Sequence, residues 1–258
     1  MTTTGPAVAP QPRGRLRTAA HLARRPRVRA LLLYVAYMLT TFVAGLAVKA
    51  IVPHWSGTAQ SLVTMIPLVV LVTVLVMRFG GWHAAGFTPP RQWRDLRLLV
   101  LPALLVFTPL VAGFAPVEPG LLTMLVVGYA LTGFMEEAMW RGVIPHVLRP
   151  TGVLSSALLG SALFGAAHLS NILFRENPAL VASQAVGAFC FGVGYAALRH
   201  RTGTIWPLMV LHMATDLFAA TGAVPKIPIL VAQDVILLVF GLILLRRPRT
   251  PANDAAPP

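Results

Sequence analysis

The segment Gly133-Phe134-Met135-Glu136-Glu137-Ala138-Met139-Trp140-Arg141-Gly142 places two carboxylates and an arginine in an otherwise apolar stretch. An ionisable side chain at the middle of a bilayer costs about 2.5–3.5 kcal/mol on insertion scales, so this group of three requires a specific reason. Glu137 and Arg141 are four residues apart and share one helix face, where they can form an ion pair. Glu136 is rotated by about 100° from Glu137, so its charge can remain unpaired. Glu136 is therefore the first candidate for chemistry.

The composition of the whole chain is that of a membrane protein. Of its 258 residues, 56% are hydrophobic and 11% are charged, and the mean hydropathy is +0.73. Soluble domains are about 25% charged. The apolar runs are about 20 residues long and do not alternate, and backbone groups in hydrocarbon must find their hydrogen bonds within the segment. We therefore predict an all-α polytopic membrane protein with about eight transmembrane helices.

The chain divides into a basic tail over residues 1–29, a membrane domain over 30–245 and a second tail over 246–258. The predicted spans cover residues 30–48, 61–77, 98–117, 121–148, 153–174, 179–198, 205–220 and 229–245. Pro102 and Pro109 predict bends in the third span, and Pro145 predicts a kink or an end of the fourth. The first dozen residues are expected to be disordered, and 15–29 to form a helix on anionic headgroups.

The basic residues are distributed unevenly about these spans. If the N-terminus lies inside and eight spans alternate, 17 of the 21 basic residues lie inside and three lie outside, with Arg141 within a span. This asymmetry predicts an inner (plasma) membrane protein with both termini in the cytoplasm. Because the basic groups flank spans and form no compact patch, the net charge of +13 does not require a nucleic acid partner. The single cysteine, Cys190, allows no internal disulfide, and no cofactor is expected.

Six ionisable residues fall within three of the predicted spans, and they are Glu136, Glu137, Arg141, His168, His212 and Asp216. At a rise of about 1.5 Å per residue, Glu136, His168 and His212 lie about 20, 22 and 12 Å from the cytoplasmic ends of their spans. These depths agree within about two helical turns, so the three helices can converge on one polar site. His212 and Asp216 are four residues apart, so the carboxylate can hold one ring nitrogen and fix the tautomer. Each group alone is also compatible with a structural hydrogen bond or ion pair.

The three motifs resemble those of a known family. Glu136-Glu137-x-x-x-Arg141, Phe164-x-x-x-His168 and His212-x-x-x-Asp216 are similar in order and spacing to the motifs of the CPBP family. These are the CAAX-protease and bacteriocin-processing intramembrane glutamic endopeptidases, also called the Abi family. The resemblance covers about residues 120–220, whereas the first three spans resemble the family only in hydropathy.

The resemblance implies an eight-helix core and a metal-independent peptidase site that opens toward the cytoplasm. By the family pattern, Glu136 with His168 activates a water, and Glu137 with Arg141 orders the site. The His212 motif stabilises the oxyanion. The best-known eukaryotic and archaeal members carry Asn where this chain has Asp216, and an ionised Asp cannot donate a hydrogen bond. We therefore expect Asp216 to orient His212.

Three functions remain open at this stage. The first is an endopeptidase that acts on a peptide or membrane-protein substrate presented from the lipid bilayer or the cytoplasm. The second is a non-catalytic bacteriocin-immunity or scaffold protein, and the third is a proton-coupled transporter, because intramembrane Glu, His and Asp also form proton relays. Two histidines and several carboxylates are plausible zinc ligands, but the HExxH signature is missing from the sequence, as are GxSxG and GxGD.

Overall fold

The structure is a computed structural model that describes residues 25–173 and 177–247. Within these ranges the regular structure is helical, apart from one isolated bridge between Phe114 and Gly222. The prediction of an all-α membrane protein is confirmed. The predictions for the N-terminal tail before residue 25 and for the C-terminal tail after residue 247 concern positions outside the described residues.

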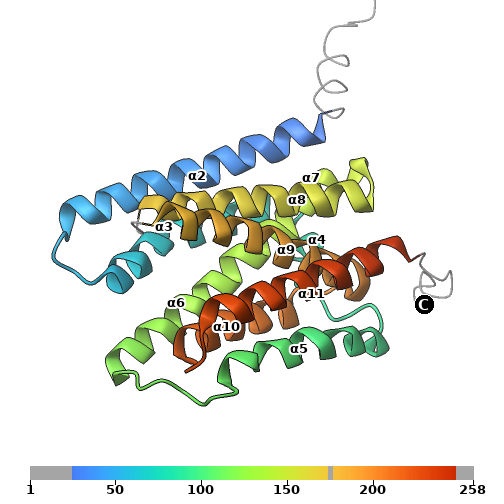
Figure 1. The fold of residues 1–258 in the computed structure, drawn as a ribbon. Helices are drawn as coiled ribbons and strands as arrows, with labels where there is room; N and C mark the ends of the chain where they lie inside the picture. Colours follow the sequence, from blue (N-terminus) through green and yellow to red (C-terminus); the bar gives the residue numbers. More distant parts are fainter. Residues whose placement is uncertain (1–24, 174–176, 248–258) are drawn as a thin grey trace, which may run out of the picture.

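The helical elements follow one another in the order seen in Figure 1. They are α2 (Pro26–Ile51), α3 (Gly57–Arg78), α4 (Gly81–Ala85), η1 (Trp93–Leu99), α5 (Val100–Val106), η2 (Thr108–Leu110), α6 (Pro119–Glu137), η3 (Ala138–Val143), α7 (Ile144–Leu148), η4 (Arg149–Thr151), α8 (Val153–Ala167), η5 (His168–Leu173), α9 (Pro178–Thr202), α10 (Trp206–Thr221) and α11 (Lys226–Arg246).

Six helices of the described chain are long and apolar enough to cross a membrane. They cover Pro26–Ile51, Gly57–Arg78, Pro119–Thr151, Val153–Ile172, Pro178–Thr202 and Ile227–Arg246. The predicted span at 205–220 corresponds to α10, which has only 16 residues. The predicted span at 98–117 is divided among short elements. The count of eight spans is therefore not confirmed.

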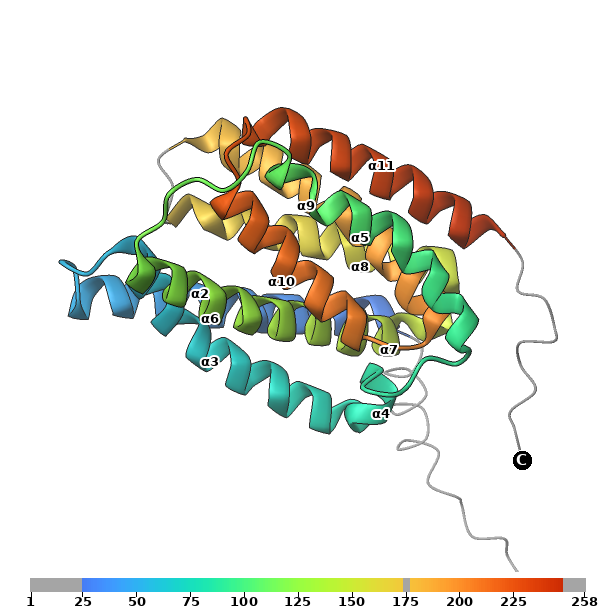
Figure 2. The ribbon, with the colours of Figure 1, turned by 90° about the horizontal axis from the view of Figure 1, so that it is seen from below.

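The prolines explain why the third predicted span is divided. Pro102 lies in α5, which has seven residues, and Pro109 lies in the 3-10 segment η2. Proline removes a backbone donor and clashes with the preceding helical turn, so two of them seven residues apart end the helix rather than only bend it. The resulting short helix α5 packs on α10, as Figure 2 shows.

The helices that carry the candidate residues approach one another closely at glycines. Helix α6 packs on α3 and α10, and α9 packs on α8 and α11. A Cβ atom at Gly133 would lie 2.8 Å from the carbonyl oxygen of Met209, and one at Gly165 would lie 2.6 Å from that of Ala185. Small residues allow backbones to come this close in membrane proteins. The contact at Gly133 places α10 directly beside the end of α6.

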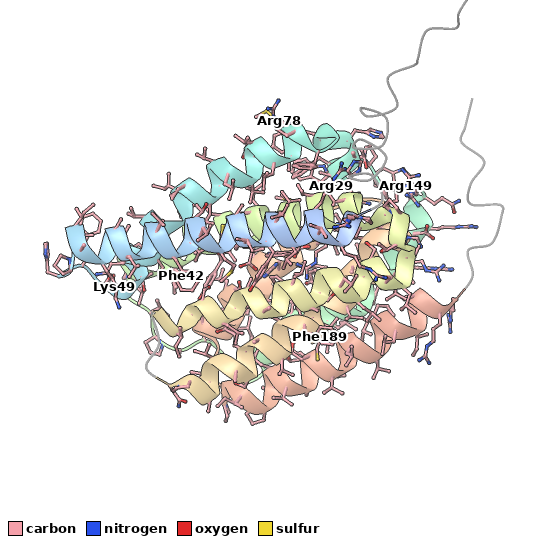
Figure 3. All side chains as sticks on the ribbon, turned by 90° about the horizontal axis from the view of Figure 1, so that it is seen from above. Arg29, Phe42, Lys49, Arg78, Arg149 and Phe189 are labelled. Carbon is pink, nitrogen blue, oxygen red and sulfur yellow. The ribbon has the colours of Figure 1, made fainter. Side chains whose placement is uncertain are left out.

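The charged side chains are concentrated at one end of the helix bundle. Figure 3 places Arg29, Arg78 and Arg149 toward one end and Lys49 at the other. Between these ends, large apolar side chains face outward, among them Leu39 and Val43 of α2, which are 59% and 66% exposed. An outward apolar band between polar ends is typical of a membrane-spanning bundle.

We expect Gly241→Ala to destabilise the protein by about 1–3 kcal/mol, because the added methyl group overpacks a backbone contact. A Cβ atom at Gly241 would lie 2.8 Å from both the Cα and the N atom of Gly194 across the α9–α11 interface. Thermal unfolding in detergent measures the change. Gly57→Ala is the matched control, since a Cβ atom there meets nothing within 4 Å. Equal stability of the two variants would contradict this account of the interface.

The N-terminus of α6 predicts a pH-dependent contribution to stability. Glu118 caps this helix by accepting hydrogen bonds from the backbone N–H groups of Gly120, at 2.9 Å, and Leu121, at 2.8 Å. These bonds favour the carboxylate and lower the pKa of Glu118 from its ordinary value of 4.5. The stabilisation by Glu118 is complete above the ordinary pKa of the carboxyl group. It is lost as the pH falls through the lowered pKa that Glu118 has in the folded protein. The stability difference between wild type and Glu118→Ala should therefore shrink as unfolding is measured at decreasing pH below 4.5. A difference independent of pH would contradict this role.

Candidate active site

The two glutamates lie at the point where α6 changes into a different kind of helix. Glu137 is the last residue of α6, and the six residues Ala138–Val143 that follow form a π-helical segment, η3. A π-helical turn is wider than an α-helical turn and is often found at functional sites. The segment contains Arg141, and all six of its residues are buried.

The predicted ion pair between Glu137 and Arg141 is confirmed. The Nη1 atom of Arg141 lies 3.0 Å from Oε1 of Glu137, and the two side chains are 1% and 0% exposed. Taking two charges out of water is costly, so a pair this deeply buried requires further polar partners. Glu137 has one in His212, whose Nδ1 lies 2.7 Å from the same carboxylate oxygen.

This hydrogen bond determines the state of the His212 ring. A carboxylate only accepts hydrogen bonds, so Nδ1 of His212 carries the proton and donates it to Glu137. The other ring nitrogen, Nε2, is then an acceptor in the neutral ring and a donor only in the imidazolium. Nε2 faces two more carboxylates, with Glu136 Oε2 at 3.6 Å and Asp216 Oδ2 at 3.8 Å.

The expected role of Asp216 in orienting His212 stays a prediction, because Asp216 lies within ion-pair distance of the ring while Glu137 makes the short hydrogen bond to it. The distance of 3.8 Å from Asp216 to the ring is too long for a hydrogen bond. The spacing of four residues brings Asp216 near the ring, but Glu137 reaches the other nitrogen from the neighbouring helix. Spacing along one helix indicated only Asp216 as a partner of His212, and the packing of α6 on α10 adds Glu137.

The three carboxylates differ in their access to solvent. The side chain of Glu137 is fully buried, that of Glu136 is 14% exposed and that of Asp216 is 34% exposed. The Oε2 atom of Glu136 is buried and accepts no hydrogen bond from the described residues. The expectation that the charge of Glu136 remains unpaired stays a prediction, because Oε2 lies within ion-pair distance of His212 Nε2, at 3.6 Å. Oε2 of Glu137 also lacks a hydrogen-bond partner among the described residues, but Oε1 of Glu137 contacts both Arg141 and His212. Glu136 has only the longer contact to His212.

His168 lies on the same side of the bundle but meets a different set of groups. It begins the 3-10 segment η5, directly after α8, and its Nδ1 lies 3.0 Å from the carbonyl oxygen of Phe164. Nδ1 therefore donates, and Nε2 remains an acceptor in the neutral ring. The charges of Asp216, His212 and Arg141 act on this ring. Among the described residues, His168 makes no hydrogen bond or ion pair with Glu136. The ion-pair contact of Glu136 is with His212 instead.

Three aromatic rings enclose Arg141, and two of them, those of Phe191 and Tyr195, were not predicted from the sequence. The guanidinium carbon lies 4.5 Å from the centre of the Phe164 ring, 5.4 Å from that of Tyr195 and 5.5 Å from that of Phe191. Cation–π contacts of this kind are strongest where water is excluded. Phe191 and Tyr195 are four residues apart on α9, so the sequence did contain a signal, namely two aromatic rings on one face of a helix otherwise rich in small residues.

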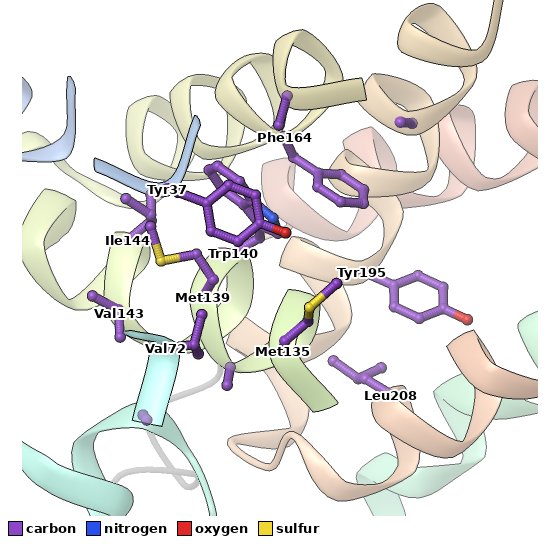
Figure 4. Close-up of a cluster of buried hydrophobic side chains, with 14 of the residues drawn as sticks. Tyr37, Val72, Met135, Met139, Trp140, Val143, Ile144, Phe164, Tyr195 and Leu208 are labelled. Carbon is purple, nitrogen blue, oxygen red and sulfur yellow. The ribbon is translucent and has the colours of Figure 1, made fainter. Parts of the chain in front are cut away.

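Helix α2 adds a second aromatic group beside the site. Tyr37 is 6% exposed and packs edge-on against Trp140, with ring centres 5.3 Å apart. Trp140 in turn lies 5.8 Å from Phe164, and Figure 4 shows these three rings together in the buried cluster. The Nε1 donor of Trp140 is buried without a hydrogen-bond partner among the described residues. The site thus receives side chains from α2 as well as from the three motif-bearing segments.

The arrangement is dominated by proton donors and acceptors. Among the described residues no cluster of three or more His, Cys, Asp and Glu side chains is arranged to hold a metal ion.

Asp234, which had no evident partner in the sequence, lies outside this group and packs against Gly187 of α9. The geometry therefore unites Glu136, Glu137, Arg141, His212 and Asp216 by direct contacts, with His168 joined to them through Phe164.

The fold and the site define a class, a multi-pass membrane protein with a buried carboxylate–histidine centre. A family model described as type II CAAX prenyl endopeptidase Rce1-like matches residues 118–218, which include all six candidate residues. This segment is therefore similar to the CAAX-protease family, and the resemblance seen in the three motifs is confirmed. Neither the curated proteins nor the solved structures contain a match to the chain.

Replacing Arg141 by Met should destabilise the protein by about 3–5 kcal/mol, because it leaves the charge of Glu137 buried without its cation. The double variant Glu137→Gln/Arg141→Met removes both charges and should recover part of that loss. Thermal unfolding in detergent measures both. Arg78→Met is the control, since Arg78 is exposed at the end of α3. If Arg141→Met loses no more stability than Arg78→Met, the buried ion pair is not required for the stability of the protein.

Proposed function

We propose that this protein is an intramembrane endopeptidase that hydrolyses peptide bonds with a water activated by Glu136. The match of residues 118–218 to the CAAX-protease family model supports a protease that acts on a peptide substrate in the bilayer. The observation that carries the finer proposal is the free Oε2 atom of Glu136, which is buried and lies 3.6 Å from Nε2 of His212. A polar contact of this length is suited to a bridging water.

In the proposed reaction Glu136 is the general base. It accepts a proton from the water while the water oxygen attacks the scissile carbonyl carbon, which becomes a tetrahedral oxyanion. The carbon–nitrogen bond then breaks, and the proton held by Glu136 passes to the leaving nitrogen. The products are a new carboxyl terminus and a free amine, so atoms and charges balance.

The proposed role of His212 is to stabilise the oxyanion. Because Nδ1 is committed to Glu137 at 2.7 Å, only a protonated Nε2 can donate to the oxyanion. Three carboxylates face this ring, and opposite charges at such distances favour the imidazolium. Glu137 and Arg141 hold the ring in place, so they act as positioning residues.

His168 and Asp216 complete the proposed site from its exposed side. The unprotonated Nε2 of His168 can accept a hydrogen bond from the water or from the substrate. Asp216 is the most exposed of the three carboxylates and stands beside the donor nitrogen of His212, where it can bind a substrate N–H or keep the ring charged. The mechanism uses side-chain chemistry alone, and we propose that it needs no metal.

We further propose that the site operates in an inner (plasma) membrane with both termini in the cytoplasm. The support is the distribution of basic residues, most of which flank the same ends of the spans. Arg29, Arg78 and Arg149 lie toward one end of the bundle, and Lys49 lies at the other (Figure 3). The chain would then present its arginine-rich end to the cytoplasm.

Glu136→Gln should lower the rate of peptide cleavage by about 10²–10⁴-fold while the protein stays folded, because Gln cannot accept the proton. Purified protein in detergent is incubated with a peptide mixture, and new termini are counted by mass spectrometry. Glu118→Gln is the matched control, since it alters a carboxylate at the other end of the same helix. Cleavage by Glu136→Gln at the wild-type rate would reject the mechanism. Loss of cleavage in both Glu136→Gln and Glu118→Gln would show that the effect is not specific to the site.

A further inference from the structure

Two arginines at the basic end of the bundle lie close together without an acidic partner. The charge of Arg91 acts directly on Arg199, which lies near the end of α9. The Nε atom of Arg199 is buried and has no hydrogen-bond acceptor among the described residues. No carboxylate in the described part of the chain lies within ion-pair distance of either guanidinium. Like charges held together in a partly buried place are unfavourable unless an anion joins them.

The backbone around these arginines is built to hold them in this position. The segment after α4 is joined to the connection between α9 and α10 by two backbone hydrogen bonds, Arg91 N to Thr202 O at 2.8 Å and Ile205 N to Gly86 O at 2.9 Å. The hydroxyl of Thr88 adds a third, to the carbonyl oxygen of Gly203 at 3.2 Å. The two segments therefore form one fixed platform.

Each arginine packs on a glycine of the opposite segment. The guanidinium of Arg199 lies against Gly86, and the side chain of Arg91 lies against Gly203. A Cβ atom at either glycine would collide with the arginine, and both glycines have the positive φ values that side-chain-bearing residues avoid, +97° and +77°. Arg199 is half-buried and Arg91 is exposed, so the pair is open on one side.

The surroundings of the platform are those of a membrane interface. Phe87, next to Gly86, packs edge-on against Trp82 at 4.8 Å and Trp206 at 5.2 Å. Both tryptophans are exposed, at 41% and 53%, and Trp93, which is 74% exposed, follows Arg91 by two residues. Exposed tryptophans concentrate at the level of lipid headgroups. Phospholipid headgroups, which carry phosphate, lie at this level of a membrane.

We infer that Arg91 and Arg199 bind the phosphate group of an anionic phospholipid at this end of the membrane domain. A guanidinium presents a planar fork of donors that matches phosphate oxygens, and two of them can hold one phosphate from two sides. The anion removes the repulsion between the two cations and supplies the acceptor that Arg199 Nε lacks. This site is independent of the proposed peptidase activity.

The test compares unfolding of the purified full chain in two kinds of nanodisc, phosphatidylcholine alone and phosphatidylcholine with increasing phosphatidylglycerol. Phosphatidylglycerol should raise the unfolding temperature of the wild type. Arg199→Gln should weaken its apparent affinity by about tenfold, because one set of charged hydrogen bonds is lost. In pure phosphatidylcholine the same variant should be at least as stable as the wild type, since it removes a like-charge contact.

Arg149→Gln is the matched control, because Arg149 is an exposed arginine that Figure 3 places toward the same end. It should bind phosphatidylglycerol as the wild type does. If Arg199→Gln does not fold, the exposed Arg91→Gln should show the same loss of affinity. Equal responses of the wild type and both Gln variants would overturn the site. Equal stabilisation of the detergent-solubilised wild type by inorganic phosphate would overturn its assignment to a lipid.

Discussion

The contact between Glu137 and Arg141 is the constraint on which the site depends. It lies within a fully buried turn, it shares its carboxylate with His212, and its guanidinium is enclosed by rings from α8 and α9. Four separate elements therefore meet at one ion pair. In a medium where charges are costly, separating this pair would leave a buried charge without its partner, so the contact opposes any shift of these elements relative to one another.

Much of this arrangement could be predicted from the sequence. The spacing of Glu137 and Arg141 predicted their ion pair. The similar depth of the polar motifs predicted that α6, α8 and α10 approach one another; α6 packs on α10, and Phe164 of α8 reaches Arg141 and His212. A prediction from local spacing is reliable because residues four apart on a helix are neighbours regardless of the tertiary structure. The family match over residues 118–218 coincides with the part of the chain where these local rules are most informative.

The remaining features depend on contacts between distant segments. Whether His212 is held by Asp216 or by Glu137 is decided at Gly133, where the backbones of α6 and α10 nearly touch. The aromatic enclosure of Arg141 and the contribution of Tyr37 depend on which faces of α2 and α9 turn inward, and helices that are apolar on all sides carry little periodic signal. The prediction of a continuous third span was wrong for a different reason. Hydropathy alone predicts an uninterrupted helix there, but the two prolines divide it.

The π-helical segment at Ala138–Val143 also makes the geometry of the site sensitive to the number of residues in this turn. Such a segment amounts to one residue inserted into an α-helix, with the surplus absorbed locally. Removing a single residue from this turn would restore a regular helix while leaving both flanking parts in their present contacts. A deletion of one residue within Ala138–Val143 would therefore change the turn that carries Arg141, while α6 and α7 kept their lengths.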